Sequence, residues 1–288
     1  MKSKFTYSFL ILGMIISSVQ VHAAEFLDVQ DLYIGTDPKE ITVSDLNGDG
    51  SKDIVFVDQG AIKVIYQTPP YSNVESVNFD GTAKLRVDES IDFAADNSTI
   101  SFWVKMSSLP ADGAETVFFV ENHSDDISVK NAQIYYRDSQ LFFKYGVNVS
   151  TMFTLNEWHH VVAINNLATD RVQIIFDGVL IMNRGGAYDY PDIASGITVG
   201  ASDQNKAYMD GKMDDLLYFN TALSTLATKS LYHNSDVYTH SNFSNIKLWL
   251  TMGDEKYDSF EKIVDKSMNN HDATPTNITF SNDIRTEL

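Results

Sequence analysis

Short stretches in which apolar and polar residues alternate fill most of the chain from residue 74 to residue 217. Every second residue is apolar in residues 99–106, and the alternation returns in residues 158–164 and 172–176. The dipeptide Asp177-Gly178, typical of tight hairpin turns, follows the last of these stretches. Because side chains alternate between the two faces of a strand, this pattern predicts antiparallel strands that pack as two sheets.

A smaller group of strands is predicted ahead of this region. Residues 40–44, 53–58 and 61–67 are three apolar stretches of strand length, separated by polar turns. The expected fold class is therefore all-β, with an antiparallel β-sandwich and a small N-terminal β-hairpin or blade-like unit over residues 24–70.

An acidic loop joins the first two of these short stretches. Side-chain oxygens fall at its first, third, fifth and ninth positions, a glycine at the sixth position permits a sharp turn, and the seventh position offers a backbone carbonyl. This order of oxygen ligands is that of a calcium-binding loop. The predicted Ca²⁺ ligands are Asp45, Asn47, Asp49, Ser51 and Asp53. Phe56 stands where an EF-hand carries its bidentate Glu, and a metal-free acidic turn is the alternative.

The segment ITVSDLNGDGSKDIVFVD, which contains this loop, resembles the FG-GAP or VCBS-type repeat. In that repeat an Asp-x-Asn-x-Asp-Gly-x-x-Asp loop joins two strands of a propeller blade. The resemblance occurs once in the chain, and a single blade does not close a propeller. It therefore implies a calcium ion that stabilises a turn, and not an integrin-like assembly.

The first 23 residues have the pattern of a secretory signal peptide. Lys2 and Lys4 precede an apolar run at residues 9–16, and small residues around Ala23 form a cleavage site. This run is too short to cross a bilayer as a helix, and no later segment is apolar enough for membrane insertion. We expect a cleaved signal peptide over residues 1–23 and a secreted or periplasmic protein. An uncleaved N-terminal anchor is the alternative.

Composition narrows the classes of function. The chain has no cysteine, which excludes disulfides, iron–sulfur clusters, thiolate zinc sites and a cysteine nucleophile. Its 39 acidic residues outnumber its 21 basic residues, for a formal net charge of −18. Because so negative a protein repels phosphate backbones, we expect no nucleic-acid partner. For an exported chain without disulfides, a bound metal ion is one source of rigidity.

Six segments follow one another in the order found in laminin-G-like domains of the concanavalin A-like lectin/glucanase superfamily. They are VNFDGTAKLRV (77–87), STISFWVKM (98–106), NEWHHVVAI (156–164), RVQIIFDGVLI (171–181), ITVGAS (197–202) and GKMDDLLYFNTALS (211–224). The resemblance covers residues 74–233 and implies a jelly-roll sandwich of two curved sheets. Residues 246–254 and 263–277 resemble the tail that follows such domains in some bacterial and phage surface proteins. We therefore expect residues 234–288 to pack on the sandwich, after a short helix over residues 224–233.

The resemblance also implies binding sites. In related folds an acidic residue at the start of the last strand holds a structural calcium with backbone carbonyls near Phe79 to Gly81. Asp214 and Asp215 stand at this position here, and Asp215 is the predicted ligand. Relatives also contact ligands at the rim of the sandwich, and two polar loops carry side chains suited to sugars, because aromatic rings stack on sugar faces and Asp or Asn bonds hydroxyl groups. The candidate ligand contacts are Tyr188, Asp189, Tyr190, Asn122 and Asp125. The alternative for each loop is that its polar side chains are only solvated and contact no ligand.

The residues that suggest catalysis have simpler interpretations. Glucanases of this superfamily set two carboxylates on one strand face about 5 Å apart, whereas this chain has adjacent acidic pairs that point to opposite faces of a strand. His159 and His160 match a family position where a histidine begins a strand and bonds the backbone. Trp103 fits either the core or a ligand-binding face.

These observations favour a secreted, non-enzymatic recognition protein. We expect calcium-dependent binding of carbohydrate on a glycan or a cell-surface or matrix component, in adhesion or in extracellular matrix. Two alternatives stay open: a structural or protein-binding secreted module without sugar specificity, and a glycan-cleaving enzyme of the superfamily. A glycan-binding measurement distinguishes the recognition protein from the structural or protein-binding module. Two carboxylates that face each other across one sheet would identify the glycan-cleaving enzyme.

Overall fold

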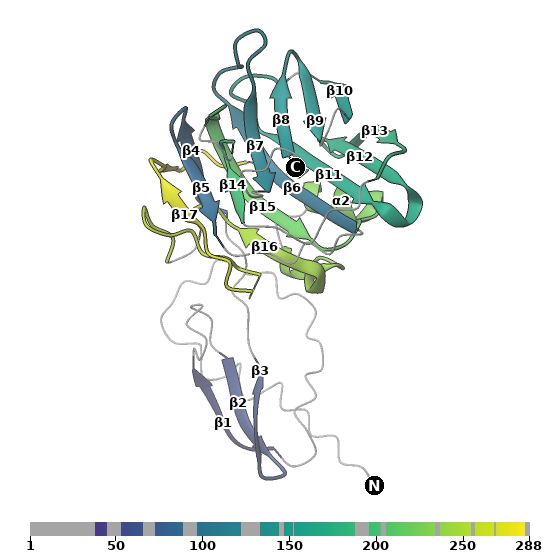
Figure 1. Cartoon of the computed structure of the whole chain (residues 1–288). Helices are drawn as coiled ribbons and strands as arrows, with labels where there is room; N and C mark the ends of the chain where they lie inside the picture. The colour runs from purple at the N-terminus through teal and green to yellow at the C-terminus, as the bar shows by residue number, and fades with distance from the viewer. Residues whose placement is uncertain are drawn as a thin grey trace. The chain divides into compact units, whose positions relative to one another are not determined.

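The computed structural model divides the chain into two compact units, residues 1–69 and 70–288, and each unit is described by itself (Figure 1). The described residues are 38–44, 53–65, 73–88, 97–121, 133–143, 147–151, 153–187, 196–202, 206–233, 237–254, 257–267 and 269–285. The predicted signal peptide, residues 1–23, lies outside them.

The N-terminal unit contains a three-stranded antiparallel sheet in the order β1-β2-β3. β1 spans Pro38–Ser44, β2 spans Asp53–Asp58 and β3 spans Ala61–Ile65. Ser44, the last residue of β1, pairs with Asp53, the first residue of β2. The small N-terminal sheet predicted from the three apolar stretches is confirmed.

The second unit is a sandwich of two antiparallel sheets, and the first sheet has seven strands. In spatial order they are β10 (Val147–Ser150), β9 (Gln140–Phe143), β8 (Gln133–Arg137), β7 (Thr116–Glu121), β14 (Ile197–Val199), β5 (Lys84–Val87) and β17 (Thr274–Thr276). Neighbours in space are distant in sequence at β7, β14 and β5, which is the crossing connectivity of a jelly roll.

The second sheet has eight strands. In spatial order seven of them are β13 (Val179–Arg184), β12 (Arg171–Phe176), β11 (His159–Asn166), β6 (Asn97–Met106), β15 (Asp210–Phe219), β4 (Ser76–Asp80) and β18 (Thr279–Ser281). The eighth, β16 (Ile246–Leu250), also pairs with β15. An all-β antiparallel sandwich with a small N-terminal sheet is the fold class that the sequence predicts, and it is confirmed.

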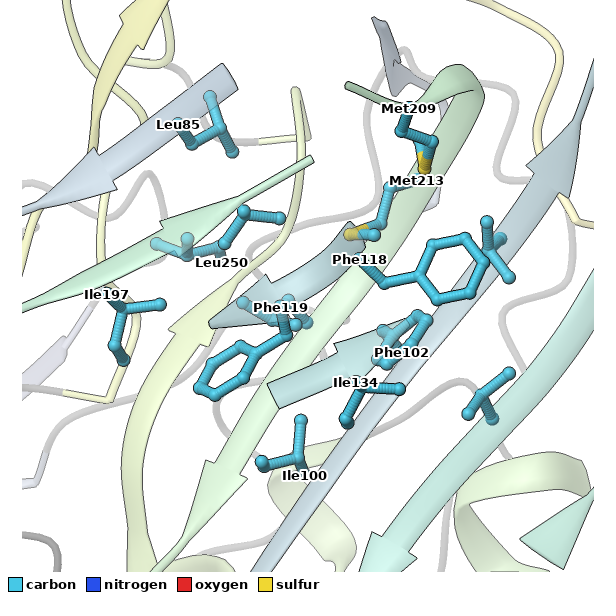
Figure 2. Packing of buried hydrophobic residues seen from close by; sticks show 14 of the residues in the cluster. Leu85, Ile100, Phe102, Phe118, Phe119, Ile134, Ile197, Met209, Met213 and Leu250 are labelled. Atoms are coloured by element: carbon cyan, nitrogen blue, oxygen red, sulfur yellow. The ribbon is translucent and has the colours of Figure 1, made fainter. Parts of the chain in front are cut away.

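The hydrophobic core lies between the two sheets (Figure 2). In β6 the core residues Ile100 and Phe102 occupy alternate positions, as the period of two requires. Across the core from them lie Phe118 and Phe119 of β7, and the ring centroids of Phe102 and Phe118 are 5.6 Å apart. The two sheets therefore bury their facing surfaces against each other, and a second hydrophobic cluster lies outside the eight-stranded sheet.

The C-terminal residues add strands to both sheets. β17 pairs with β5 in the seven-stranded sheet, and Figure 1 shows these two strands side by side, in yellow and blue. β18 pairs with β4, and β16 with β15, in the eight-stranded sheet. The strands β16, β17 and β18 are therefore built into the sandwich.

A short helix, α2 (Thr225–His233), packs on the outer face of the eight-stranded sheet. Its residues Ala227 and Leu231 share a hydrophobic cluster with Phe219 of β15 and Trp249 of β16. The helix predicted over residues 224–233 is confirmed. Short 3₁₀ helices are η1 (Leu167–Thr169), η2 (Val237–Thr239) and η3 (Phe243–Asn245). None of the helices in the described part of the chain has the length and apolarity needed to cross a membrane.

Candidate functional site

The predicted calcium loop falls between two paired strands. Its ligands Asp45, Asn47, Asp49 and Ser51 lie outside the described residues, and Asp53 is described only as the first residue of β2. The flanking strands β1 and β2 pair antiparallel up to both ends of the loop. The loop therefore connects a hairpin, as in the strand-flanked repeat that its sequence resembles.

The two predicted sugar-binding loops leave the sandwich at neighbouring points. Their candidate residues Tyr188, Asp189, Tyr190, Asn122 and Asp125 lie outside the described residues. Glu121 ends β7 just before the first loop, and Ile197 begins β14 just after the second. These two residues are partners in the antiparallel pair of β7 and β14. The two segments are thus attached at the same end of the seven-stranded sheet.

A β-bulge in β15 decides where the acidic pair of the last sequence motif lies. The pairing of β15 with β6 shifts between Asp214, opposite Trp103, and Leu217, opposite Ser101. Asp215, inside the shift, has a φ of 46°, in the left-handed region. In a regular strand the two carboxylates point to opposite faces, but the bulge brings both to the outer face of the eight-stranded sheet.

Asp215 is held in a buried ion pair. Its carboxylate accepts hydrogen bonds from Arg285 Nη2 at 2.7 Å and from Trp249 Nε1 at 3.3 Å. The carbonyls that the resemblance places beside it are remote, because Phe79 lies opposite Gly211. At about 3.3 Å per residue, Gly211 is about 13 Å along the strand from Asp215. The predicted set of Asp215 and the carbonyls of residues 79–81 does not come together.

Asp214 is the carboxyl group with an unsatisfied oxygen. Its Oδ2 accepts a hydrogen bond of 2.7 Å from Asn73 Nδ2. Its Oδ1 is buried and has no hydrogen-bond partner among the described residues, and the same is true of Asn73 Oδ1. Two buried oxygens without donors are unfavourable unless something positive lies against them, and carboxylate and amide oxygens are ligands of Ca²⁺.

The charges around Asp214 also favour a cation. Burial raises the pKa of Asp214 well above its usual range, and the charges of Asp215 and Asp254 raise it further. Arg285 is the positive charge that opposes them. Within the described ranges, no three His, Asp or Glu side chains converge on one point as metal ligands do. A cation here therefore requires Asn73, backbone carbonyls or water in addition to Asp214.

A second candidate site lies on the outer face of the seven-stranded sheet. Tyr135 and Arg137 of β8 share this face with Phe142 of β9. The rings of Tyr135 and Phe142 stack with centroids 4.6 Å apart and planes within 5°. The Arg137 guanidinium lies 4.9 Å from the centroid of Phe142 and 5.8 Å from that of Tyr135. We call these three residues the aromatic platform. Phe142 is buried and Tyr135 is half-buried.

Polar side chains flank the aromatic platform. Arg137 forms an ion pair of 2.8 Å with Glu115, and Asn148 Nδ2 donates to Gln140 Oε1 at 3.2 Å. Burial raises the pKa of Tyr135, and so does the charge of Glu115. The hydroxyl of Tyr135, like that of any tyrosine at neutral pH, is able to donate a hydrogen bond. Amide, hydroxyl and charged groups beside a half-buried ring are the set that binds a sugar, whose faces are apolar and whose edge is polar.

The aromatic platform is not among the predicted sites, although part of its signal is present in the sequence. In residues 133–137 the buried Ile134 and Tyr136 face the core, so the residues between them face outward. The sequence alone did not reveal that Phe142 lies opposite Tyr135, because that register depends on the turn between β8 and β9.

The paired histidines have structural roles. His159 begins β11, and its Nε2 accepts a hydrogen bond of 3.1 Å from the main-chain N of Thr154, as predicted. Its Nδ1 lies 2.8 Å from Asp177 Oδ2. His160 is buried, and its Nε2 lies 2.8 Å from Ser101 Oγ. Both rings are therefore engaged inside the fold.

Trp103 is also buried, on the outer face of the eight-stranded sheet. Its ring stacks with that of Tyr232 of α2 at 5.5 Å, and the Arg285 guanidinium lies 5.1 Å from its centroid. Of the two predicted positions for Trp103, the packed one is observed.

Comparison with known proteins identifies the family. Residues 79–226 match the sequence model of the concanavalin A-like lectin/glucanases superfamily (Laminin_G_3). No curated protein matches the sequence. The family match does not reach residues 24–70, for which the resemblance to an FG-GAP or VCBS-type repeat stays a prediction from the loop motif.

Several solved structures have similar folds at low identity. A candidate carbohydrate binding protein from Bacteroides ovatus superposes with a TM-score of 0.56 at 13% identity, over 80% of this chain and 68% of that chain. The native heptameric SAP-like pentraxin from Limulus polyphemus superposes with a TM-score of 0.49 at 14% identity, over 73% of this chain and 95% of that chain. The carbohydrate-binding module of Ruminococcus gnavus IT-sialidase, bound to α2,3-sialyllactose, superposes with a TM-score of 0.44 at 14% identity, over 57% of this chain and 100% of that chain.

The family match covers just over half of the 288 residues, and it coincides with the two-sheet sandwich and its crossing connectivity. The Bacteroides ovatus structure shows the same fold. The chain belongs to the concanavalin A-like lectin/glucanase superfamily.

Proposed function

We propose that the protein is an exported recognition protein without enzymatic activity, and that it binds carbohydrate through the aromatic platform. The observation that carries the proposal is the stack of Tyr135 on Phe142 beside the Arg137 guanidinium, on a sheet face of a concanavalin A-like sandwich. The fold shared with a candidate carbohydrate binding protein supports it by analogy.

The chemistry of the aromatic platform suits a sugar ring. The half-buried ring of Tyr135 offers an apolar surface against which the C–H face of a sugar packs. Glu115, Gln140 and Asn148 surround it with acceptors and donors for hydroxyl groups. The ion pair between Arg137 and Glu115 holds both side chains in place, so little side-chain entropy is lost on binding.

We further propose that the protein holds calcium at two places. In the sandwich, Asp214 Oδ1 and Asn73 Oδ1 supply two of the oxygens. In the N-terminal unit, the ligands are those of the Asp45–Asp53 loop, as in an FG-GAP or VCBS-type repeat. Calcium at these places stabilises the scaffold, and a role in adhesion or in extracellular matrix follows from an exported, calcium-stabilised glycan binder.

The test of carbohydrate binding is a glycan array followed by titration of the best glycan. The full chain is compared with Tyr135→Ala and with Tyr257→Ala, which removes an exposed tyrosine of the C-terminal segment. We expect Tyr135→Ala to weaken binding at least about tenfold, equivalent to about 1.4 kcal/mol, because the packing surface is lost. Tyr257→Ala should bind as the unmodified chain does.

Three outcomes count against the proposal. Absence of any glycan signal favours a structural or protein-binding module. Glycan binding that Tyr135→Ala leaves intact moves the site away from the aromatic platform. Release of new reducing ends from the bound glycan identifies a glycan-cleaving enzyme. Thermal unfolding of both variants verifies that each is folded.

A further inference from the structure

Two lysines face each other on the outer surface of the eight-stranded sheet. Lys105 of β6 and Lys212 of β15 are direct partners in the antiparallel register. Their side chains are 19% and 21% exposed. Like charges directly opposite each other destabilise a sheet, so this pair marks a place where the fold needs a negative charge.

The carboxylate of Asp283 supplies that charge. Lys105 Nζ donates to its Oδ1 at 3.0 Å, Lys212 Nζ donates to its Oδ2, and Trp158 Nε1 donates to Oδ1 at 3.4 Å. Desolvation acts against ionisation, but the hydrogen bonds and charges of Lys212 and Lys105 together lower the pKa of Asp283. Three N–H donors from separate parts of the sheet thus converge on one carboxylate.

The two lysines lie on central strands of the sheet, whereas the Asp283 carboxylate lies at its edge. β6 and β15 are ten-residue strands inside the sheet, whereas Asp283 follows β18, a three-residue strand at its edge. The main chain of Asp283 is fixed by Ser76 Oγ, which donates to its carbonyl at 2.8 Å. The Asp283 side chain is 36% exposed, so solvent and an external carboxylate reach it from one side.

We propose that Lys105, Lys212 and Trp158 form a carboxylate-binding site which Asp283 fills when no ligand is present, and that the ligand is a uronate-bearing glycan. Two ammonium groups and an indole N–H hold a carboxylate, and the half-buried indole beside them offers a face to a sugar ring. The choice of an acidic sugar rests on the proposed carbohydrate binding. The site itself lies on the other sheet from the aromatic platform.

Asp283 competes with an external carboxylate because it belongs to the same chain. A tethered group acts at an effective concentration in the millimolar range, so a free uronate binds the unmodified chain weakly. Asp283→Asn keeps the size of the side chain and removes the competing charge. The two lysines are then left without their anion.

The test measures binding of polygalacturonate to the full chain by calorimetric titration at low salt. We expect Asp283→Asn to bind about tenfold more tightly than the unmodified chain, and addition of Lys212→Met to abolish the gain. Asp272→Asn is the matched control, because Asp272 is a partly exposed carboxylate paired with Lys262, as Asp283 is with its lysines, and the change removes the same negative charge.

The variants separate this site from general charge effects. Equal gains for Asp283→Asn and Asp272→Asn overturn the proposal, because both then report weaker repulsion of a polyanion. If Asp283→Asn binds polygalacturonate no more tightly than the unmodified chain does, the proposal is overturned too. Tighter binding by Asp283→Asn alone, and not by Asp272→Asn, supports the carboxylate site. If the gain persists when Tyr135→Ala is added to Asp283→Asn, the site stands even where the aromatic platform fails its own test.

A measurement on the unmodified chain tests the proposal even if a variant fails to fold. Galacturonate at millimolar concentration should shift the indole N–H resonance of Trp158, one of three tryptophans, whereas neutral methyl galactoside should not. An unchanged Trp158 resonance at concentrations that saturate the variant contradicts displacement of Asp283.

Discussion

At the scale of single residues, His160 is a histidine that the fold keeps uncharged. Burial and the charge of Arg285 lower its pKa from 6.5 to about 3. Its Nε2 lies 2.8 Å from Ser101 Oγ, and its ring centroid lies 4.8 Å from that of Trp103 and 5.8 Å from that of Tyr232. Protonation would place a charge inside this packed group, where burial and the like charge of Arg285 both oppose it.

This pKa predicts acid-sensitive stability. The unfolded chain binds a proton at His160 near pH 6.5, and the folded chain does so only at about pH 3, so stability is lost as pH falls through that window. The loss is at most about 1.4 kcal/mol per pH unit. His160→Gln keeps a polar group for Ser101 and does not titrate. Urea unfolding at a series of pH values should give the variant a shallower dependence, and parallel profiles would contradict a neutral buried His160.

Individual residues of the candidate cation site also show what a sequence does not reveal. Asp214 belongs to a recognisable segment, but Asn73 is 141 positions away along the chain. Asp254 is bonded to the segment that follows Asn73, because its Oδ1 accepts hydrogen bonds from the main-chain N of Val74 and Glu75. Alternation of apolar and polar residues reports which face a side chain occupies, and not which distant strands are neighbours.

At the scale of elements, the strands follow from local pattern, whereas their irregularities do not. The alternation in residues 99–106 predicts β6, because burial of one face imposes a period of two. The bulge in β15 breaks that period, and with it the expectation that Asp214 and Asp215 point to opposite faces. A bulge depends on how two strands fit together, so it is invisible in either strand alone.

The connection that follows β14 requires glycine for two separate reasons. Gly200 has a φ of 79°, and its N–H donates to the carbonyl of Phe118 at 3.0 Å. A Cβ at this position would lie 2.4 Å from two carbons of the Phe79 ring, which is fully buried. Positive φ and close packing therefore act together at one residue.

We expect Gly200→Ala to lower the free energy of unfolding by about 2–4 kcal/mol, because backbone strain and overpacking combine. Gly113→Ala is the matched control, since Gly113 has a φ of 74° and no atom within 4 Å of the added Cβ. The control should lose only about 1 kcal/mol. Urea unfolding measures both, and similar losses would show that contact with Phe79 contributes little.

At the scale of the whole molecule, the excess of acid over base bears on calcium. With 39 acidic and 21 basic residues, the folded chain concentrates negative charge, and bound cations reduce the resulting repulsion. At 100 times its dissociation constant, a bound ion adds about 2.7 kcal/mol to stability, enough to raise the unfolding midpoint by several degrees.

We therefore expect residues 24–288 to unfold at a higher temperature with calcium than with chelator, and magnesium to replace calcium poorly. Asp214→Asn should remove the part of the rise that belongs to the sandwich, and Asp49→Ala the part that belongs to the N-terminal unit. Asp112→Asn, a change at an exposed turn, serves as control. An unchanged midpoint at millimolar calcium would exclude both proposed calcium sites.

The pairing of β4 with β18 and of β5 with β17 has a kinetic consequence. The hydrogen bond between Ser76 and Asp283 joins residues 207 positions apart, so one edge of the eight-stranded sheet forms only when the first and the last strand of that sheet meet. Contacts this distant in sequence form late, and all-β chains rich in them fold in milliseconds to seconds. During that interval the sandwich is incompletely folded, which would leave time for the proposed export step to act before the last strands pair.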